Sequence, residues 1–307
     1  YSAEMTVSDE ILKRTADTYR RIRNTARFLL ANLNGFDPAE HMLDSREMLS
    51  LDRWAVARAH QLQQQVIEAY RDYSFHVIYQ KLHNFCAVDM GGFYLDIIKD
   101  RQYTTQANSV ARRSAQTALF HIAEAMCRWL APILSFTADE IWRYIPGEHG
   151  ESVQLENWYQ GLFELDENES MNMDFWQQLL ETRSAVGKQL ENLRIDNKIG
   201  SSLDAEVSVY CNGGLQQNLG KLDDELRFVM ITSDAQIGPP DARPDSAVEA
   251  RLGNGDTLYI KAEASTHDKC VRCWHHRADV GKDQQHPELC GRCVQNVAGD
   301  GEARRYA

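Results

Sequence analysis

Apolar residues recur at steps of three and four over most of the first 150 positions, which is the period of an amphipathic helix. The clearest stretch runs from Ile11 to Leu33, with Ser8 in the position of an N-cap and acidic residues in the first turn. Gly91-Gly92 is expected to interrupt a later apolar stretch. Helices are predicted over 9–33, 51–73, 75–89 and 106–131. The pattern therefore predicts a helical bundle over residues 1–150.

A shorter helix is predicted near the end of this bundle. Thr137 and Glu140 have the spacing of a capping box, in which each side chain satisfies a backbone donor near the other. Phe136 and Ile141 have the spacing of the hydrophobic staple that accompanies such a box. Pro146-Gly147 is expected to close the helical part.

Residues 151–264 have a different pattern. A helix is predicted over 174–193, and apolar and polar residues then alternate over 205–211, as in a half-buried strand. Another strand is predicted over 226–231. Two apolar runs that flank Gly253-Asn254-Gly255-Asp256 predict a hairpin. The sequence thus predicts a small α+β junction domain between the bundle and residues 265–307, and a mainly α fold.

The amino-acid composition excludes several classes of protein. Hydrophobic residues make up 43% of the 307 and charged residues 25%, which is typical of globular proteins and excludes a disordered or collagen-like chain. No run approaches the roughly 18 consecutive apolar residues of a membrane span, so no membrane partner is expected. The chain begins with Tyr1 and has no leader pattern, so it is interpreted as a piece of a longer, cytoplasmic protein.

The net charge of −12 argues against nucleic-acid binding by the chain taken whole, but the basic residues are clustered. Residues 9–31 contain six basic and three acidic side chains, and residues 101–129 contain four arginines and one glutamate. Arg20, Arg21, Arg23 and Arg27 could contact phosphates if they are exposed and unpaired. The alternative is an ordinary solvated helix face.

The seven cysteines fall into two sets. Cys86, Cys127 and Cys211 lie in apolar sequence and are expected to be buried. The others, Cys270, Cys273, Cys290 and Cys293, form two Cys-x2-Cys pairs separated by sixteen residues. Each tight turn can present two sulfurs to one ion, and two turns complete a tetrahedron, so this spacing predicts one structural Zn²⁺ without an open position. Gly291 is expected to permit the bend of the second turn. Redox or disulfide pairing is the alternative.

Two arginines and a tryptophan surround the first cysteine pair. Arg272 lies between its cysteines, Trp274 follows it, and Arg277 comes shortly afterwards. An indole held on a rigid turn could stack on an unpaired base, and an arginine could add hydrogen bonds. Alternatively, Trp274 packs in the small core of the module and Arg272 is solvated.

Several longer motifs resemble a known family. The segment Leu82-His83-Asn84-Phe85, which continues through Gly91-Gly92-Phe93-Tyr94 to Asp100-Arg101-Gln102-Tyr103, resembles the anticodon-binding helical domain of class I aminoacyl-tRNA synthetases. The run Leu130-Ala131-Pro132 to Asp139-Glu140-Ile141-Trp142 is similar to a signature of the isoleucyl, valyl and leucyl branch. Lys198-Ile199-Gly200-Ser201-Ser202-Leu203-Asp204-Ala205, followed by the four-cysteine module, resembles bacterial isoleucyl-tRNA synthetases over nearly the whole chain.

The resemblance implies a parent enzyme that uses ATP and Mg²⁺ to attach isoleucine to its tRNA. The family signatures His-Ile-Gly-His and Lys-Met-Ser-Lys-Ser are absent, as is the editing domain. The chain is therefore expected to be a C-terminal part with no catalytic residue, which binds the anticodon stem-loop of isoleucine tRNA. Its other partners would be the N-terminal catalytic and editing domains of the same protein, and a monomer is expected. The implied domains are 1–150, 151–264 and 265–307.

Two other functions stay open at this point. A zinc-ribbon DNA-binding protein of the formamidopyrimidine-DNA glycosylase type has a similar cysteine module, but those enzymes need an N-terminal Pro-Glu, whereas this chain begins Tyr1-Ser2-Ala3-Glu4. The module could also be a non-catalytic structural element that only holds the C-terminal segment in place.

Overall fold

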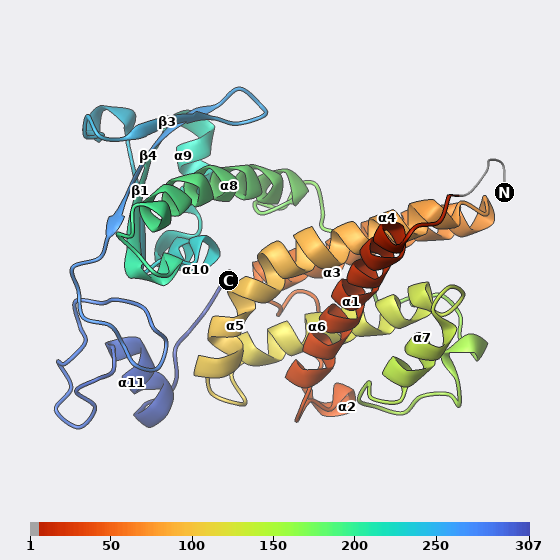
Figure 1. Cartoon of the computed structure of the whole chain (residues 1–307). Coiled ribbons are helices and arrows are strands. Elements are labelled where there is room, and N and C mark those ends of the chain that lie inside the picture. The colour runs from red at the N-terminus through yellow and green to blue at the C-terminus, as the bar shows by residue number, and fades with distance from the viewer. Residues whose placement is uncertain (1–5) are drawn as a thin grey trace. The chain divides into compact units, whose positions relative to one another are not determined.

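A computed structural model describes residues 6–307 (Figure 1). The chain divides into two compact units. The helical unit comprises residues up to Met48, Ala55–Asp96 and Arg113–Glu164. The mixed unit comprises Leu49–Trp54, Ile97–Arg112 and Leu165–Ala307. The three-part division at residues 150 and 264 stays a prediction.

Within residues 6–155 the regular elements are helices, joined by loops. The helices are α1 (Asp9–Asn32), α2 (Pro38–His41), α3 (Ser50–Arg71), α4 (Phe75–Asn84), the π-helix η1 (Phe85–Tyr94), α5 (Leu95–Thr104), α6 (Val110–Leu130) and α7 (Ser135–Trp142), followed by the 3-10 turn η2 (Val153–Leu155). The predicted mainly α fold is confirmed. No helix within residues 6–307 is both long and apolar enough to cross a membrane.

The start of α1 follows the sequence signal. The Ser8 side chain accepts a hydrogen bond from the backbone N–H of Ile11 at 3.3 Å, which satisfies one of the free donors of the first turn. Farther along the helix, Ile22 and Leu29 are buried, and α1 packs on α4 and η1. The apolar residues from Ile22 to Leu33 thus belong to the core of the helical unit, whereas Ile11 and Tyr19, earlier in the same stretch, are exposed.

The predicted break at Gly91-Gly92 is wrong. The chain continues in wide helical turns through η1 and directly into α5. A Cβ atom on Gly91 would lie 3.0 Å from the carbonyl oxygen of Cys86, and one on Gly92 would lie 3.3 Å from that of Ala87. The two glycines therefore permit close backbone packing inside a helix and do not end it.

The predicted capping box at Thr137 and Glu140 is also wrong. Helix α7 begins at Ser135, and its N-cap residue Leu134 makes no side-chain cap. Thr137 consequently lies inside the first turn, where its hydroxyl is 3.1 Å from the hydroxyl of Tyr19. Phe136 is 94% exposed, so it forms no hydrophobic staple.

The mixed unit adds a four-stranded sheet and further helices. Its strands are β1 (Ala205–Tyr210), β2 (Asp234–Gly238), β3 (Val248–Arg251) and β4 (Thr257–Ala264), in the order β2-β1-β4-β3. Its helices are α8 (Met173–Ile195), α9 (Gly213–Gly220), α10 (Leu226–Met230) and α11 (Gly291–Ala298), with 3-10 turns η3 (Ser202–Asp204), η4 (Asp223–Glu225) and η5 (Pro240–Ala242). Strand β1 is parallel to β2 and antiparallel to β4, and α8 packs on β4.

The strand prediction over 205–211 and the hairpin are confirmed, because β1 alternates between buried and partly exposed residues and β3 pairs with β4. The strand predicted over 226–231 is wrong. Those residues form the buried helix α10, which ends where Ile231 adopts the left-handed conformation at φ 56°. A short apolar run fits a buried strand and a buried helix equally well, so the pattern could not separate them.

Burial shifts the pKa of several side chains in both units. Cys86, Cys127 and Cys211 are buried, as predicted. Burial raises the pKa of the Cys86 and Cys127 thiols to about 12 and that of Cys211 to about 11. In the helical unit, a 2.8 Å hydrogen bond joins His121 Nδ1 to the hydroxyl of Tyr159, and burial lowers the pKa of His121 from 6.5 to about 4.

His121 is expected to make the helical unit sensitive to mild acid. Because its pKa is lower in the folded state, its contribution is complete above pH 6.5 and is lost as pH falls toward 4. The shift corresponds to at most about 3 kcal/mol. His121→Asn, which retains a hydrogen-bonding group for Tyr159, should flatten the pH dependence of the free energy of unfolding between pH 4 and 6.5, measured by urea titration. An unchanged slope would contradict this assignment.

Candidate metal centre and RNA-binding residues

The four cysteines of the predicted zinc module converge in the structure. The sulfur atoms of Cys270, Cys273, Cys290 and Cys293 all lie within 4.8 Å of one another, and all four residues are buried. The Cys273 and Cys290 sulfurs are 3.7 Å apart, too far for a disulfide. A tetrahedral ion with metal–sulfur bonds of about 2.3 Å would place its ligands about 3.8 Å apart. The donor set and its spacing therefore fit Zn²⁺.

Backbone groups hold the first turn in shape. The N–H of Trp274 donates to the carbonyl of Cys270, and the N–H of Cys270 donates to the carbonyl of His275, both at 2.9 Å. The N–H of Cys290 donates to the sulfur of Cys270 at 3.3 Å. Hydrogen bonds from the Cys270, Cys290 and Cys293 thiols lower the pKa of Cys273. Hydrogen bonds with the neighbouring thiols raise the pKa of Cys290 and Cys293, so the four thiols do not all ionise on their own, and a bound cation would stabilise the remaining thiolates.

The prediction for Gly291 needs correction. Gly291 is the first residue of α11 and its φ is not positive, so it makes no special bend. Its N–H donates to Asp279 Oδ2 at 3.0 Å, and an added Cβ would lie 2.8 Å from the same oxygen. The glycine therefore provides space for the Asp279 carboxylate.

Trp274 occupies the conformation that glycine usually takes after such a turn. Its φ is 66°, in the left-handed region that is unfavourable for bulky residues, and its side chain is 62% exposed. The indole consequently does not pack in the small core of the module. A strained backbone that presents an exposed aromatic ring is an arrangement found at binding sites.

The two arginines near Trp274 are already engaged. Arg272 Nη1 donates to the carbonyl oxygen of Thr104 at 2.6 Å. Arg277 Nη1 donates to the carbonyl oxygen of Ser233 at 3.1 Å and lies 3.6 Å from Asp234 Oδ1. These contacts favour a structural role for both guanidinium groups. Their contact with RNA stays a prediction.

The arginines of α1 meet the two conditions set for phosphate contact only in part. Arg20, Arg21, Arg23 and Arg27 are all exposed. Arg20 forms an ion pair with Asp17 at 2.8 Å. Among the described residues, the side chains of the other three have no hydrogen-bond or ion-pair partner. Arg23 and Arg27 share a helix face with Arg20, so a narrow basic face remains available for an anion.

The second basic stretch, residues 101–129, is largely used inside the protein. Arg101 forms a buried, two-bonded ion pair with Asp52, at 2.5 and 2.8 Å, in the mixed unit. Arg128 pairs with the buried carboxylate of Glu124 at 2.6 Å in the helical unit. The charge count along the sequence could not separate these internal arginines from surface ones.

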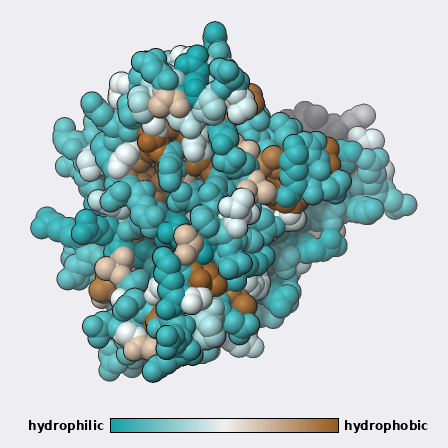
Figure 2. Space-filling view, turned by 90° about the vertical axis from the view of Figure 1, so that its left-hand side faces the viewer, coloured by the Kyte–Doolittle hydropathy of each residue, from teal (hydrophilic) through white to brown (hydrophobic). Residues whose placement is uncertain are grey.

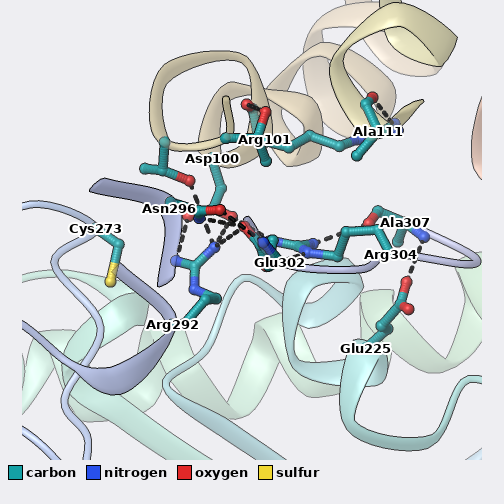
Figure 3. A network of polar contacts seen from close by, with 12 residues as sticks. Asp100, Arg101, Ala111, Glu225, Cys273, Arg292, Asn296, Glu302, Arg304 and Ala307 are labelled. Carbon is teal, nitrogen blue, oxygen red and sulfur yellow. Dashed lines mark hydrogen bonds and ion pairs between the residues drawn. The ribbon is translucent and has the colours of Figure 1, made fainter. Parts of the chain in front are cut away.

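Sequence reasoning missed a second arginine beside the metal centre. Arg292 stands between Cys290 and Cys293 and forms a two-bonded ion pair with Asp100, at 2.7 and 2.8 Å (Figure 3). Burial alone would raise the pKa of Asp100, but Arg292 and Arg304 outweigh it and hold that pKa below its usual range. The signal was present, because both cysteine turns have the pattern Cys-x-Arg-Cys.

The molecular face shown in Figure 2 is mostly hydrophilic, and its hydrophobic residues lie in small separate groups. Such a surface is unlike the wide apolar patches that serve as hydrophobic interfaces. A ligand that binds this face would therefore make mainly polar and charged contacts.

Comparisons with known proteins agree with this arrangement. A family model described as the anticodon-binding domain of tRNA ligase matches residues 52–209, just over half of the chain. A second one, described as a zinc finger found in FPG and IleRS, matches residues 268–296, which include the four cysteines.

The chain is also similar over its whole length to several curated proteins named isoleucine–tRNA ligase. It is 63% identical to that of Thioalkalivibrio sulfidiphilus, 61% to that of Alkalilimnicola ehrlichii and 58% to that of Pseudomonas aeruginosa. The chain spans about a third of the length of these relatives. The DNA-glycosylase alternative is not favoured, because the similarity to the ligases extends far beyond the zinc finger. The chain thus belongs to the family of anticodon-binding domains of tRNA ligases.

Proposed function

We propose that this chain is the tRNA-binding C-terminal region of an isoleucine–tRNA ligase and that it holds the anticodon stem-loop of isoleucine tRNA. The single observation that supports this most is the combination, in one chain, of an anticodon-binding domain with a four-cysteine centre of the kind matched by a zinc-finger family model. The remainder of the longer protein would attach isoleucine with ATP and Mg²⁺ and would edit errors. The cytoplasm and a monomeric state stay predictions.

Cys270, Cys273, Cys290 and Cys293 would hold one Zn²⁺ as a structural ion. The fit rests on four buried thiols within 4.8 Å of one another and on the 3.7 Å separation of two sulfurs. With four thiolate ligands the ion would have no free position for a substrate. Bound zinc would therefore organise the two turns and would take no part in a reaction.

RNA binding would combine two kinds of contact. The exposed arginines of α1 would contact phosphates, which gives affinity and orientation without sequence information. Trp274 would stack on an unpaired base of the anticodon loop, as exposed aromatic rings do in other proteins that bind single-stranded RNA. The engaged state of Arg272 and Arg277 makes Trp274 the stronger candidate of the three.

Trp274→Ala is expected to weaken the binding of isoleucine tRNA by roughly 5- to 150-fold, because one base–aromatic stack contributes about 1–3 kcal/mol. Val297→Ala, at another half-exposed apolar residue of the mixed unit, is the matched control and should bind normally. Fluorescence anisotropy with a labelled transcript, at one stated low salt concentration, measures the change, and elemental analysis should find unchanged zinc.

Normal affinity of Trp274→Ala would remove this residue from the RNA site. A wild-type chain that binds isoleucine tRNA no better than a transcript with a different anticodon would overturn the proposed function itself.

A further inference from the structure

Each cysteine turn places an arginine at the same position, and both arginines reach the same helix. Arg272 precedes Cys273 in the first turn, and Arg292 precedes Cys293 in the second. Arg272 contacts Thr104, and Arg292 contacts Asp100. Asp100 and Thr104 are four residues apart on α5, so they lie on one face of that helix. The arginines of the two cysteine turns therefore both contact one face of α5. The metal module is defined here as residues 265–307.

The contact at Asp100 is made of balanced, nearly buried charges (Figure 3). Both carboxylate oxygens accept from Arg292, and Oδ2 also accepts from Arg304 Nη2 at 2.6 Å. Glu302 accepts from both arginines, at 3.1 and 2.7 Å. The exposed fraction of these four side chains is at most 16%. Two positive and two negative groups therefore compensate one another where water is scarce, and removal of any one leaves a buried charge unpaired.

The contact at Thr104 uses the end of α5. Thr104 is the last residue of that helix, and the carbonyl groups of a last turn have no partner inside the helix. Arg272 supplies a hydrogen bond to this carbonyl, and its positive charge lies at the negative end of the helix dipole. The Arg272 guanidinium also lies 3.9 Å from the sulfur of Cys293, so it connects α5 to the metal centre itself.

We propose that Asp100 and the carbonyl of Thr104 form a receptor on α5 that fixes the metal module, and that Arg272 and Arg292 engage it only when a bound metal holds both cysteine turns at the correct separation. Trp274 directly follows the first cysteine pair, so a module that is fixed on α5 also holds Trp274 in place. Asp100 is then a positioning residue for Trp274. The consequence for tRNA binding rests on the proposed function, whereas docking of the module does not.

Asp100→Asn in the 307-residue chain tests the docking. The variant keeps the shape of the side chain and removes its charge. We expect the zinc content to remain unchanged while hydrogen exchange in the metal module becomes faster by about tenfold or more. Asp300→Asn, at an exposed carboxylate of the same module, is the matched control and should change neither quantity. Wild-type exchange rates in Asp100→Asn would overturn the proposal, and so would loss of zinc, since Asp100 would then support the centre and not its docking.

Two comparisons test the remaining parts. After the metal has been chelated, Asp100→Asn and wild type should exchange at the same rate, because the arginines are no longer presented together. A persistent difference would show that docking does not need the metal. Asp100→Asn should also weaken tRNA binding in the wild-type background but not in Trp274→Ala. Equal weakening in both backgrounds would exclude a positioning role, and failure of the wild type to bind tRNA would overturn only the proposed function.

Discussion

Removal of the metal ion is expected to unfold the metal module while the helical unit keeps its structure. Among residues 6–307, the hydrophobic cluster of the module consists of the four cysteines themselves, and the partly buried apolar residues packed against them are Val280 and Leu289. Structural zinc contributes about 10–16 kcal/mol in comparable small sites, which so small a core cannot replace. Hydrogen exchange measured during titration with a chelator should show protection lost across residues 265–307.

The metal dependence has a clear control. Readdition of Zn²⁺ should restore protection, whereas Mg²⁺ should not, because magnesium prefers oxygen ligands. Amides of α6 should exchange equally in both states. A fully protected module in protein shown by elemental analysis to be metal-free would contradict the structural role of the ion.

Arg101→Met is expected to destabilise the mixed unit by about 3–5 kcal/mol. Asp52 and Arg101 are 0% and 1% exposed, and the guanidinium also donates to the carbonyl of Ala111 at 3.2 Å. Loss of the arginine would leave the Asp52 carboxylate charged and buried. Hydrogen exchange of the mixed unit at increasing urea concentrations measures the change in the free energy of unfolding.

Two variants make the cause of this effect specific. Arg251→Met removes an exposed partner of Glu249 in the same unit and should change stability by less than about 1 kcal/mol. Asp52→Leu combined with Arg101→Met removes both charges and should be more stable than Arg101→Met alone. A double variant of equal or lower stability would show that the buried Asp52 charge left without its arginine is not the cause.

Local signals were sufficient for much of the fold. Ser8 marks the start of α1, and the glycines of 253–256 mark the hairpin, because caps and tight turns depend on neighbouring residues only. The cysteine spacing predicted the cluster for the same reason, since each pair needs a single turn. These features can be read without knowledge of the tertiary structure.

The errors arose where distant segments decide the outcome. The apolar run 226–230 suits a buried strand as well as a buried helix, and in the fold it is the helix α10, packed against β2 and α8. Thr137 is engaged by Tyr19, which lies 118 positions earlier. Arg272 illustrates the limit best, because its partner Thr104 is 168 positions away. The sequence shows that an arginine lies beside a cysteine turn, but it does not show whether a protein group or RNA accepts its hydrogen bonds.

The two sets of cysteines differ in their reactivity towards alkylating reagents. The number of cysteines that react can therefore be used to follow metal binding. Alkylating reagents attack thiolates, and the deeply buried Cys86, Cys127 and Cys211 hold their protons far above neutral pH. The module cysteines would be shielded by a bound ion and released when it leaves. The mass added to native protein by iodoacetamide should therefore change from none to four adducts as the ion is withdrawn, which reports metal loading molecule by molecule.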